Sequence, residues 1–356
     1  MPPYDAFLLV SFGGPEAPGE VMPFLRNVTR GRAVPPERLE EVAGHYYRFG
    51  GVSPINQQCR DLRALIGKDF AASGIDLPLY WGNRNADPYL ADTVRAMAGH
   101  GVRRAIAFAT SAYSSYSSCR QYLDDIELAR AAAGPGAPQI DKIQPYFSHP
   151  GFIEPLVQNT RRAVESLPPS VRDGAQLVFT AHSIPEAMAA ASGPGGSGAY
   201  PAQLAEAAGL IAERAGGGPS GGARPWRLAY QSRSGPPSQP WLGPDVSDCL
   251  AELSLAGVPA AVLVPVGFVS DHMEVMFDLD VEAAETARRL GLSLARAATP
   301  GTSPGFVPMI TELVRERLDG SPAAAPDSLA ALPGMCQNGC CAPSPAALAG
   351  PPRRQS

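Results

Sequence analysis

The residues best suited to chemistry follow an apolar run that extends from Ala260 to Val266. Asp271, His272 and Glu274 come shortly after it, where the chain turns polar before helical spacing resumes. The apolar run predicts a buried strand, so we expect these polar residues where a strand ends and a helix begins. In an open α/β sheet this is the edge at which ligands bind.

Three acidic residues, Glu274, Asp278 and Glu282, follow one another at intervals of four. On an α-helix this spacing stacks them on one face as like charges, which destabilises the helix. Either water solvates and screens these charges, or the three carboxylates bind a cation. A solvated face is the simpler interpretation of the acids alone, and a second stretch of similar build favours the cation.

That second stretch is the apolar segment from Gln176 to Ala181, which ends in His182. Two strand ends, one with an imidazole and one with the Glu274 carboxylate, could face each other across one cleft. Imidazole titrates near neutrality and binds borderline divalent metals, and carboxylate suits a harder, hydrated ion. The pair is therefore a candidate for binding a divalent metal and for handling protons. The structural alternatives are a histidine that caps the following turn and a plain surface acid.

The elements that must position this pair are strands alternating with helices. The alternation predicts βαβ units and parallel, doubly wound sheets. Four strands fall in each half, so we expect two similar domains, over residues 1–151 and 152–319, and a flexible tail containing Ala, Pro and Cys over 320–356. The expected strands are Ala6 to Val10, Leu77 to Trp81, Ala105 to Ala109, Lys142 to Phe147, Leu177 to Ala181, Arg227 to Gln231, Ala260 to Val266 and Leu292 to Ala295.

Helical patterns cover residues 36–48 and 54–72, and Ser53 before Pro54 predicts an N-cap. Gly- and Pro-rich segments bracket a short helical pattern over 203–214, which indicates an inserted flap. The hydroxyl-rich loop from Thr110 to Tyr122 follows a strand and could donate hydrogen bonds to carboxylates or other anions, or cap a helix. Trp241 in a Pro/Gly loop predicts either an aromatic wall or ordinary packing.

Composition excludes several classes of protein. The net charge is −5 and the basic residues are dispersed, which argues against binding of nucleic acid. No apolar stretch approaches the length of a membrane span, and the first residues lack the pattern of a signal peptide. The G-x-G-x-x-G spacing of a dinucleotide site is absent after the first strand. A cytoplasmic protein is expected.

With these residues in view, the chain resembles the ferrochelatase family. Seven motifs carry the resemblance, in family order over roughly residues 5 to 318: Leu9 to Pro15, Gly50 to Pro54, Thr110 to Tyr122, Ala181 to Pro185, Gln231 to Pro236, Pro240 to Leu242 and Val266 to Glu274. The resemblance implies two Rossmann-like domains with a porphyrin cleft between them, and insertion of ferrous iron into a tetrapyrrole.

The resemblance also implies roles for particular residues. His182 and Glu274 become the pair that binds the metal and takes the protons, and Ser53 and Tyr122 become porphyrin contacts. The Ala- and Pro-rich composition and the cysteines of the tail resemble the actinobacterial branch, for which the substrate is coproporphyrin III and the product is iron-coproporphyrin III on the coproporphyrin-dependent route to haem b. We expect a monomer with transient contacts to other haem-pathway enzymes.

The chain departs from the family pattern in places. Phe12 stands where some relatives have a tyrosine near the metal. Thr29 and His45 stand where some relatives have arginines that bind the propionates. The candidate substitutes for those arginines are Arg26, Arg30, Arg32 and Arg48.

The tail cysteines Cys336, Cys340 and Cys341 resemble the end of ferrochelatases that bind a [2Fe-2S] cluster. Such clusters need four ligands, usually thiolates. In those relatives the fourth comes from the segment equivalent to residues 149–157, where this chain has Pro155 and no cysteine. A cluster and a redox-sensitive or adventitious metal-binding tail are both open interpretations.

Alternatives to a coproporphyrin III ferrochelatase are an enzyme of the same fold acting on protoporphyrin IX, or a cobalt or nickel chelatase. A non-catalytic tetrapyrrole carrier would have the cleft without turnover. His182 and Glu274 together disfavour a carrier, because a carrier needs no proton acceptor.

Overall fold

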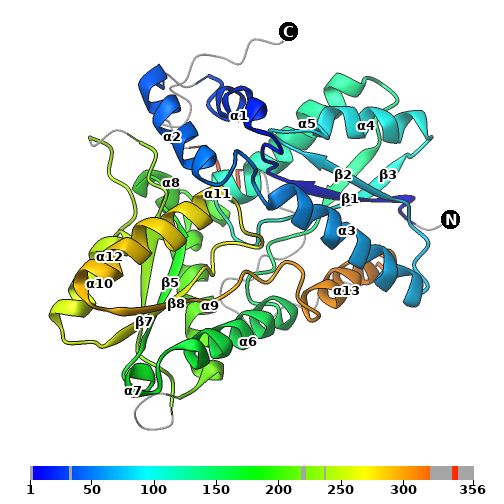
Figure 1. The fold of residues 1–356 in the computed structure, drawn as a ribbon. Coiled ribbons are helices and arrows are strands. Elements are labelled where there is room, and N and C mark those ends of the chain that lie inside the picture. Colours follow the sequence, from blue (N-terminus) through cyan, green and yellow to red (C-terminus); the bar gives the residue numbers. More distant parts are fainter. Residues whose placement is uncertain (1–2, 32–33, 218–221, 236–237, 321–338, 344–356) are drawn as a thin grey trace.

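The computed structural model describes residues 3–31, 34–217, 222–235, 238–320 and 339–343. Two four-stranded sheets, each parallel throughout, form its framework (Figure 1). The first contains β1 (Ala6–Ser11), β2 (Leu79–Asn83), β3 (Arg104–Ala109) and β4 (Gln139–Lys142), in the order β2-β1-β3-β4. The second contains β5 (Gln176–His182), β6 (Trp226–Gln231), β7 (Ala260–Val264) and β8 (Ser293–Arg296), in the equivalent order β6-β5-β7-β8. The predicted pair of doubly wound parallel sheets is confirmed.

The apolar runs are continuous because both faces of each sheet are buried. In β1, Phe7 and Leu9 belong to the largest core cluster, whereas Leu8 and Val10 point to a second cluster on the opposite face. Strand β7 alternates in the same way between the largest cluster and a third one. The largest cluster takes residues from both sheets, so one core joins the two halves of the molecule.

Helices cover the sheets, with bounds as follows: α1 (Val21–Val28), α2 (Pro36–Arg48), α3 (Ile55–Ala72), α4 (Leu90–Gly99), α5 (Gln121–Ala133), α6 (Pro150–Ser166), α7 (Pro169–Arg172), α8 (Glu186–Ala190), α9 (Ala199–Ala215), α10 (Val246–Leu255), α11 (Met273–Val275), α12 (Ala284–Leu290) and α13 (Phe306–Leu318). Two short 3₁₀ turns, η1 (Pro18–Glu20) and η3 (Pro194–Gly196), and two π-helical segments, η2 (Tyr116–Arg120) and η4 (Met276–Ala283), complete the described elements.

The last helix returns to the first half of the molecule. Figure 1 shows α13 beside α3, and the Thr311 hydroxyl donates a hydrogen bond to the Asp69 carboxylate there. The Arg315 guanidinium donates to the Ser73 carbonyl at 2.7 Å. The predicted boundary between residues 151 and 152 falls in the first turn of α6 and stays a prediction.

Two local predictions were wrong. Strand β4 lies at residues 139–142 and not at 142–147, because Pro145 has no N–H to donate to a sheet and the apolar residues around it pack into the core instead. Ser53 does not cap α3, whose N-cap is Pro54 without a side-chain bond. Its own N–H instead donates to the Pro15 carbonyl at 2.8 Å.

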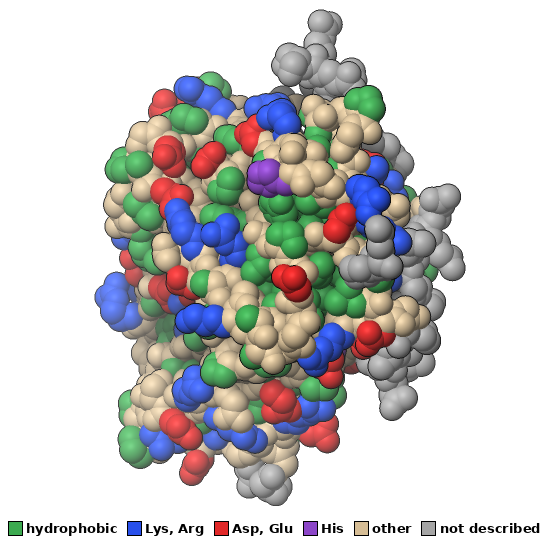
Figure 2. All heavy atoms as spheres, turned by 90° about the vertical axis from the view of Figure 1, so that its right-hand side faces the viewer, with side chains coloured by type: hydrophobic (Ala, Val, Ile, Leu, Met, Phe, Trp, Pro, Cys, Tyr) green, Lys and Arg blue, Asp and Glu red, His purple; other side chains and the backbone are tan. Residues whose placement is uncertain are grey.

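Of the predicted tail, residues 321–338 and 344–356 lie outside the described residues. None of the helices that the structure describes has the length and apolar character to cross a membrane. On the face shown in Figure 2, basic and acidic side chains are interspersed among apolar ones, in agreement with the dispersed charges of the sequence.

Candidate active site

His182 ends β5 and is held through its own backbone. The Tyr200 hydroxyl donates to the His182 carbonyl at 2.9 Å, and the N–H of Ser183 donates to the Gln231 carbonyl at 2.8 Å. The ring nitrogen Nδ1 lies 2.5 Å from the Ser183 carbonyl oxygen. Because a carbonyl oxygen can only accept, Nδ1 carries the proton of the neutral ring. The other nitrogen, Nε2, therefore keeps a lone pair for a metal or a proton.

The segment after His182 is fixed by the loop that contains Trp241. Pro185 and Trp241 form an antiparallel bridge, and the N–H of Leu242 donates to the Ile184 carbonyl at 3.0 Å. Gly235 is needed beside them, because a Cβ there would lie 2.4 Å from the Trp241 ring. Trp241 is thus a supporting residue of the turn that follows His182.

Glu274 reaches the same place from the loop after β7. The N–H of Gly267 donates to the Thr180 carbonyl at 3.0 Å, and a Cβ on Gly267 would lie 2.7 Å from Ala181. This close approach of β5 and the loop requires glycine. As a result, Oε2 of Glu274 lies 3.6 Å from Nε2 of His182. The two side chains are 48% and 36% exposed, so solvent and small ligands can reach them.

The other polar residues of this loop have different partners. The Asp271 carboxylate accepts a hydrogen bond from Arg296 at 3.1 Å. The backbone N–H of Asp271 donates to the side-chain oxygen of Gln58 on α3 at 3.0 Å. The His272 ring packs against Phe268 at 5.2 Å, and desolvation lowers the pKa of this histidine. No group of three His, Cys, Asp or Glu side chains in the described part of the chain is spaced to hold a metal ion. The pair is therefore a two-residue site, which suits an ion that must be released.

The acids after Glu274 lie on the π-helix η4. The Asp278 carboxylate accepts hydrogen bonds from the Ser232 hydroxyl and from the Gln231 amide, the latter at 3.3 Å. Burial raises the pKa of Asp278 to about 7, with a further contribution from the charges of Glu274 and Glu282. Burial also raises the pKa of Glu282. Asp278 is thus a group that gains and loses a proton near neutrality, one helical turn from Glu274.

Helix α2 brings the first half of the molecule against this acidic helix. Tyr46 is buried in a cluster with Phe24 and Met273, and the Glu274 charge adds to burial in raising the pKa of Tyr46. The His45 ring stacks on Phe277 with centroids 3.6 Å apart, and burial lowers the pKa of His45. Neither contact could be predicted from the sequence, because helical spacing does not identify the face of a helix that meets the other half of the chain.

The structure gives contacts for one of the arginines that are candidates for binding the propionates. Arg48 lies over the Phe277 ring at 5.7 Å and 3.8 Å from the Glu285 carboxylate. Arg32 lies outside the described residues. His45, which stands at one of the arginine positions, is occupied by its stack on Phe277.

Ser53 and Tyr122 lie near the carboxyl ends of the first sheet. Ser53 is 3% exposed and packs against Gly14, where a Cβ would meet it at 2.7 Å. Tyr122 is 4% exposed and lies under the Arg84 guanidinium, 4.7 Å from its ring centroid. Burial raises the pKa of Tyr122, while Arg84 and a hydrogen bond with Thr110 oppose the shift. None of the contacts described for these two residues joins them to His182 or Glu274.

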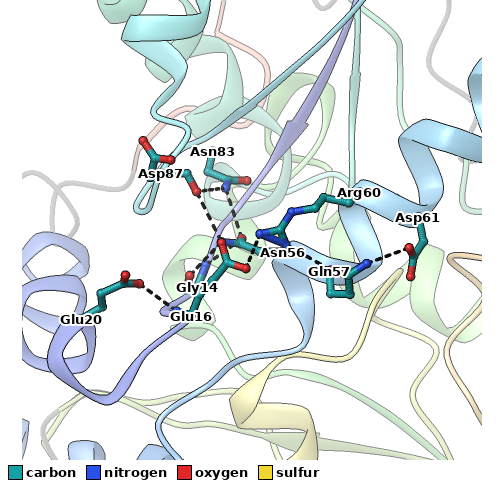
Figure 3. A network of polar contacts seen from close by, with 9 residues as sticks. All are labelled: Gly14, Glu16, Glu20, Asn56, Gln57, Arg60, Asp61, Asn83 and Asp87. Atoms are coloured by element: carbon teal, nitrogen blue, oxygen red, sulfur yellow. Dashed lines mark hydrogen bonds and ion pairs between the residues drawn. The ribbon is translucent and has the colours of Figure 1, made fainter.

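A polar network that the sequence did not reveal fixes the loop after β1 (Figure 3). Asn56 accepts from the N–H of Gly14 at 3.2 Å and donates to the Gly14 carbonyl at 3.0 Å. Asn83, at the end of β2, donates to Asn56 at 3.2 Å. The Arg60 guanidinium pairs with Glu16 at the same loop. A single asparagine at the start of α3 thus joins two strand ends.

The hydroxyl-rich loop is mostly satisfied within the protein. Ser115 caps η2 by accepting from the N–H of Ser118 at 3.0 Å, and the Ser118 hydroxyl donates to the Tyr113 carbonyl at 2.9 Å. Ser114 exchanges two hydrogen bonds with Gln203 of α9. The capping interpretation therefore accounts for more of these residues than the sequence suggested.

Comparisons with known proteins agree with one another. A family model described as Ferrochelatase matches residues 4–318. A coproporphyrin III ferrochelatase of Streptomyces coelicolor is 53% identical over 365 residues, which covers 97% of this chain and 96% of the relative. One of Nocardia farcinica is 53% identical over 349 residues, with coverage of 95% and 97%. Among solved structures, SirB from Bacillus subtilis with Fe3+ is similar in fold, with a TM-score of 0.52, 12% identity and coverage of 88% of this chain and 96% of that chain.

Proposed function

The chain belongs to the ferrochelatase family, and we propose that it inserts ferrous iron into coproporphyrin III to give iron-coproporphyrin III in coproporphyrin-dependent haem b synthesis. The observation that carries the reaction is the His182–Glu274 pair, an imidazole and a carboxylate 3.6 Å apart. The choice of porphyrin is supported by the relatives in Streptomyces coelicolor and Nocardia farcinica, which are coproporphyrin III ferrochelatases and match this chain over nearly their whole length.

Insertion exchanges two pyrrole protons for one ferrous ion, so the site must accept protons and pass on a cation. We assign His182 Nε2 as an iron ligand and proton acceptor, because Nδ1 is committed to the Ser183 carbonyl. Glu274 takes the second position, as a ligand of the hydrated ion or as a proton acceptor in turn. Two ligands bind iron weakly enough for its release to the porphyrin.

Asp278 extends this route. Its carboxyl changes protonation near neutrality and lies on η4, which continues directly from α11, the element of Glu274. We propose that it passes protons or hydrated cations between Glu274 and Glu282. The Ser232 hydroxyl and Gln231 amide hold it in place for that role.

We propose Ser53 and Tyr122 as porphyrin contacts on the side of the first sheet. Ser53 precedes α3 and packs against Gly14 in the loop after β1, and Tyr122 lies in the first turn of α5 beside Arg84, which follows β2. The carboxyl edge of a parallel sheet is where α/β proteins bind ligands. The bond of Tyr122 with Thr110 and the nearby Arg84 hold its phenol in one orientation.

The experiment that tests this proposal is anaerobic insertion of ferrous iron, followed by loss of porphyrin fluorescence, with coproporphyrin III and protoporphyrin IX offered separately. We expect faster turnover of coproporphyrin III. Preference for protoporphyrin IX would support the proposed reaction and contradict coproporphyrin III as the substrate. Tight binding of either porphyrin without insertion would identify a carrier and overturn the reaction.

The resident [2Fe-2S] group implied by the resemblance requires thiolates. The described tail places Cys340 and Cys341 in the protein interior, with their sulfurs 3.9 Å apart, and soft buried thiols are the donors that such a group uses. Cys336 lies outside the described residues. The described residues therefore supply two of the four thiolates that such a group needs, and no group of three His, Cys, Asp or Glu side chains among them is spaced to hold a metal ion.

We further propose a monomeric enzyme of the cytoplasm that makes transient contacts with other haem-pathway enzymes. The isolated cysteines Cys59, Cys119 and Cys249 are buried, which is usual in a reducing compartment. Light scattering of the purified chain measures the oligomeric state, and a stable dimer would contradict this proposal.

A further inference from the structure

The segment that carries Glu274 has little regular helical support of its own. Glu274 lies on the three-residue helix α11, whose N-cap, His272, makes no side-chain capping bond. The π-helix η4 follows directly, and π-helical turns are rare and occur mostly at functional sites. The stretch from residue 271 to 283 contains five acidic residues and no Lys or Arg. Because like charges on neighbouring turns destabilise a helix, this segment depends on residues of other elements.

Arg296 supports the segment from the end of β8. Its Nε and Nη2 atoms donate to the two carboxylate oxygens of Asp280, at 2.6 and 3.0 Å. Its Nη1 atom donates to Oδ1 of Asp271 at 3.1 Å. The two aspartates lie on either side of Glu274 in the chain. One guanidinium therefore ties both ends of the segment that carries this carboxylate.

The guanidinium is itself held in place by the sheet. Arg296 is the last residue of β8 and pairs with Leu263 of β7, and the N–H of Ala297 donates to the Leu263 carbonyl at 2.8 Å. The side chains of Arg296 and Asp271 are each 20% exposed, so water shields their charges only in part. Charge-assisted hydrogen bonds in such a place are stronger than those at the surface. The strand end is thus a rigid base for the segment.

The same segment is also tied to the first half of the molecule. The backbone N–H of Asp271 donates to Oε1 of Gln58 on α3 at 3.0 Å. His182 is held by different bonds, such as the one from the Tyr200 hydroxyl to its carbonyl. The position of Glu274 can therefore change without a change in the position of His182.

We propose that Arg296 is a positioning residue for Glu274, whose carboxylate it holds where a divalent ion can be shared with His182. It does so through its fork to Asp271 and Asp280, and it touches neither the ion nor the porphyrin. The inference rests on the proposed function. Lysine has the same charge but cannot donate to two carboxylates in this planar arrangement. A displacement of about 1 Å at a reacting group can lower a rate on the order of 100-fold.

The test is anaerobic insertion of ferrous iron into coproporphyrin III by the full chain, as wild type, Arg296→Lys and Arg104→Lys. In Arg296→Lys we expect the KM for iron to rise about 10-fold or more, while the KM for porphyrin stays at the wild-type value. Arg104 is the matched control, because it also donates through two nitrogens to an aspartate, Asp141, but at the start of β3. An equal change in the two variants, or an unchanged KM for iron in Arg296→Lys, would overturn the inference.

A double-mutant cycle shows whether Arg296 acts through Glu274. Addition of Arg296→Lys to Glu274→Gln should lower insertion by less than about twofold, because the carboxylate that Arg296 positions is already lost. A full further loss would contradict the proposal. Should Arg296→Lys fail to fold, Asp280→Asn weakens one arm of the fork and should raise the KM for iron severalfold. A wild-type KM for iron in Asp280→Asn would then count against the positioning role.

Binding of Co2+ alone, measured by absorption without porphyrin, separates this inference from the proposed reaction. We expect Co2+ to bind about 10-fold more weakly to Arg296→Lys than to wild type. Loss of the absorption in His182→Ala identifies the site that is measured. Wild-type protein that binds Co2+ but inserts no iron would overturn the reaction. Equal Co2+ affinities of wild type and Arg296→Lys would overturn the positioning role of Arg296.

Discussion

The Nε2 atom of His182, the last residue of β5, lies 3.6 Å from the Oε2 atom of Glu274, which follows the neighbouring strand β7. The arrangement depends on Gly267, which lets the loop after β7 approach β5 closely enough for the two side chains to meet. The backbone of this sheet therefore sets the geometry of the pair.

Removal of the imidazole in His182→Ala should lower the rate of iron insertion at least about 100-fold, because both a ligand and a proton acceptor are lost. The fold should survive, since the Tyr200 bond is made to the backbone of residue 182. Anaerobic fluorescence assays and thermal unfolding measure the two effects. His100→Ala, at an exposed histidine bonded to Tyr80, is the control. Wild-type rates in His182→Ala would refute the assignment.

Glu274→Gln keeps the size of the side chain but removes its charge, so we expect a loss of insertion of about 100-fold or more. The KM for iron should rise more than the KM for porphyrin, because the carboxylate is assigned to the ion. Glu252→Gln, at an exposed acid of α10 that pairs with Arg227, should leave both constants unchanged. An equal rise in the two KM values would argue against a role in iron binding.

Asp278→Asn should change the dependence of stability on pH. The pKa of this carboxyl rises from 3.8 to about 7 on folding, so the folded protein binds the extra proton between those values. Its contribution to the unfolding free energy is present below pH 3.8 and is lost as the pH rises to about 7, on the order of 4 kcal/mol in all. Asp278→Asn should flatten this slope.

Denaturant unfolding at several pH values measures the effect of Asp278→Asn. Asp61→Asn, at an exposed residue of α3, should keep the wild-type slope. Parallel plots of unfolding free energy against pH for wild type and Asp278→Asn would show that folding does not raise the pKa of the Asp278 carboxyl.

The buried ion pair of Arg84 and Asp125, with a separation of 2.5 Å, supports Tyr122. Arg84→Met should cost about 3–5 kcal/mol of unfolding free energy, because the Asp125 charge then loses its buried guanidinium partner. Arg95→Met breaks an exposed pair with Asp92 and should cost less than about 1 kcal/mol. Equal losses in the two variants would contradict the buried pairing.

Ser53→Ala and Tyr122→Phe should raise the KM for porphyrin severalfold and change kcat less, if these residues contact the porphyrin in the bound state. Tyr89→Phe, at an exposed tyrosine, is the control. An unchanged KM for porphyrin in both variants would show that Ser53 and Tyr122 are structural.

Much of the fold could be predicted because its signals are local. The continuous apolar runs of β1 and β7 arise from burial on both faces of a parallel sheet, and helix α2 was predicted with its observed bounds. Strand β4 was misplaced because the burial of Tyr146 and Phe147 in loop packing produces the same apolar pattern as a strand. Ser53 was misassigned for a similar reason, since a serine before Pro54 matches the N-cap pattern whether or not its side chain caps the helix.

The sequence by itself determined which chemical groups follow which strand ends, and so identified an imidazole and a carboxylate suited to iron and protons. Only the tertiary structure decided that His182 and Glu274 meet, that Ser232 holds Asp278, and that Asn56 joins two strand ends. The physical reason is that hydrophobic periodicity reports burial along one element. Contacts between distant elements depend on how the two sheets and α2 pack together, and no local pattern records that packing.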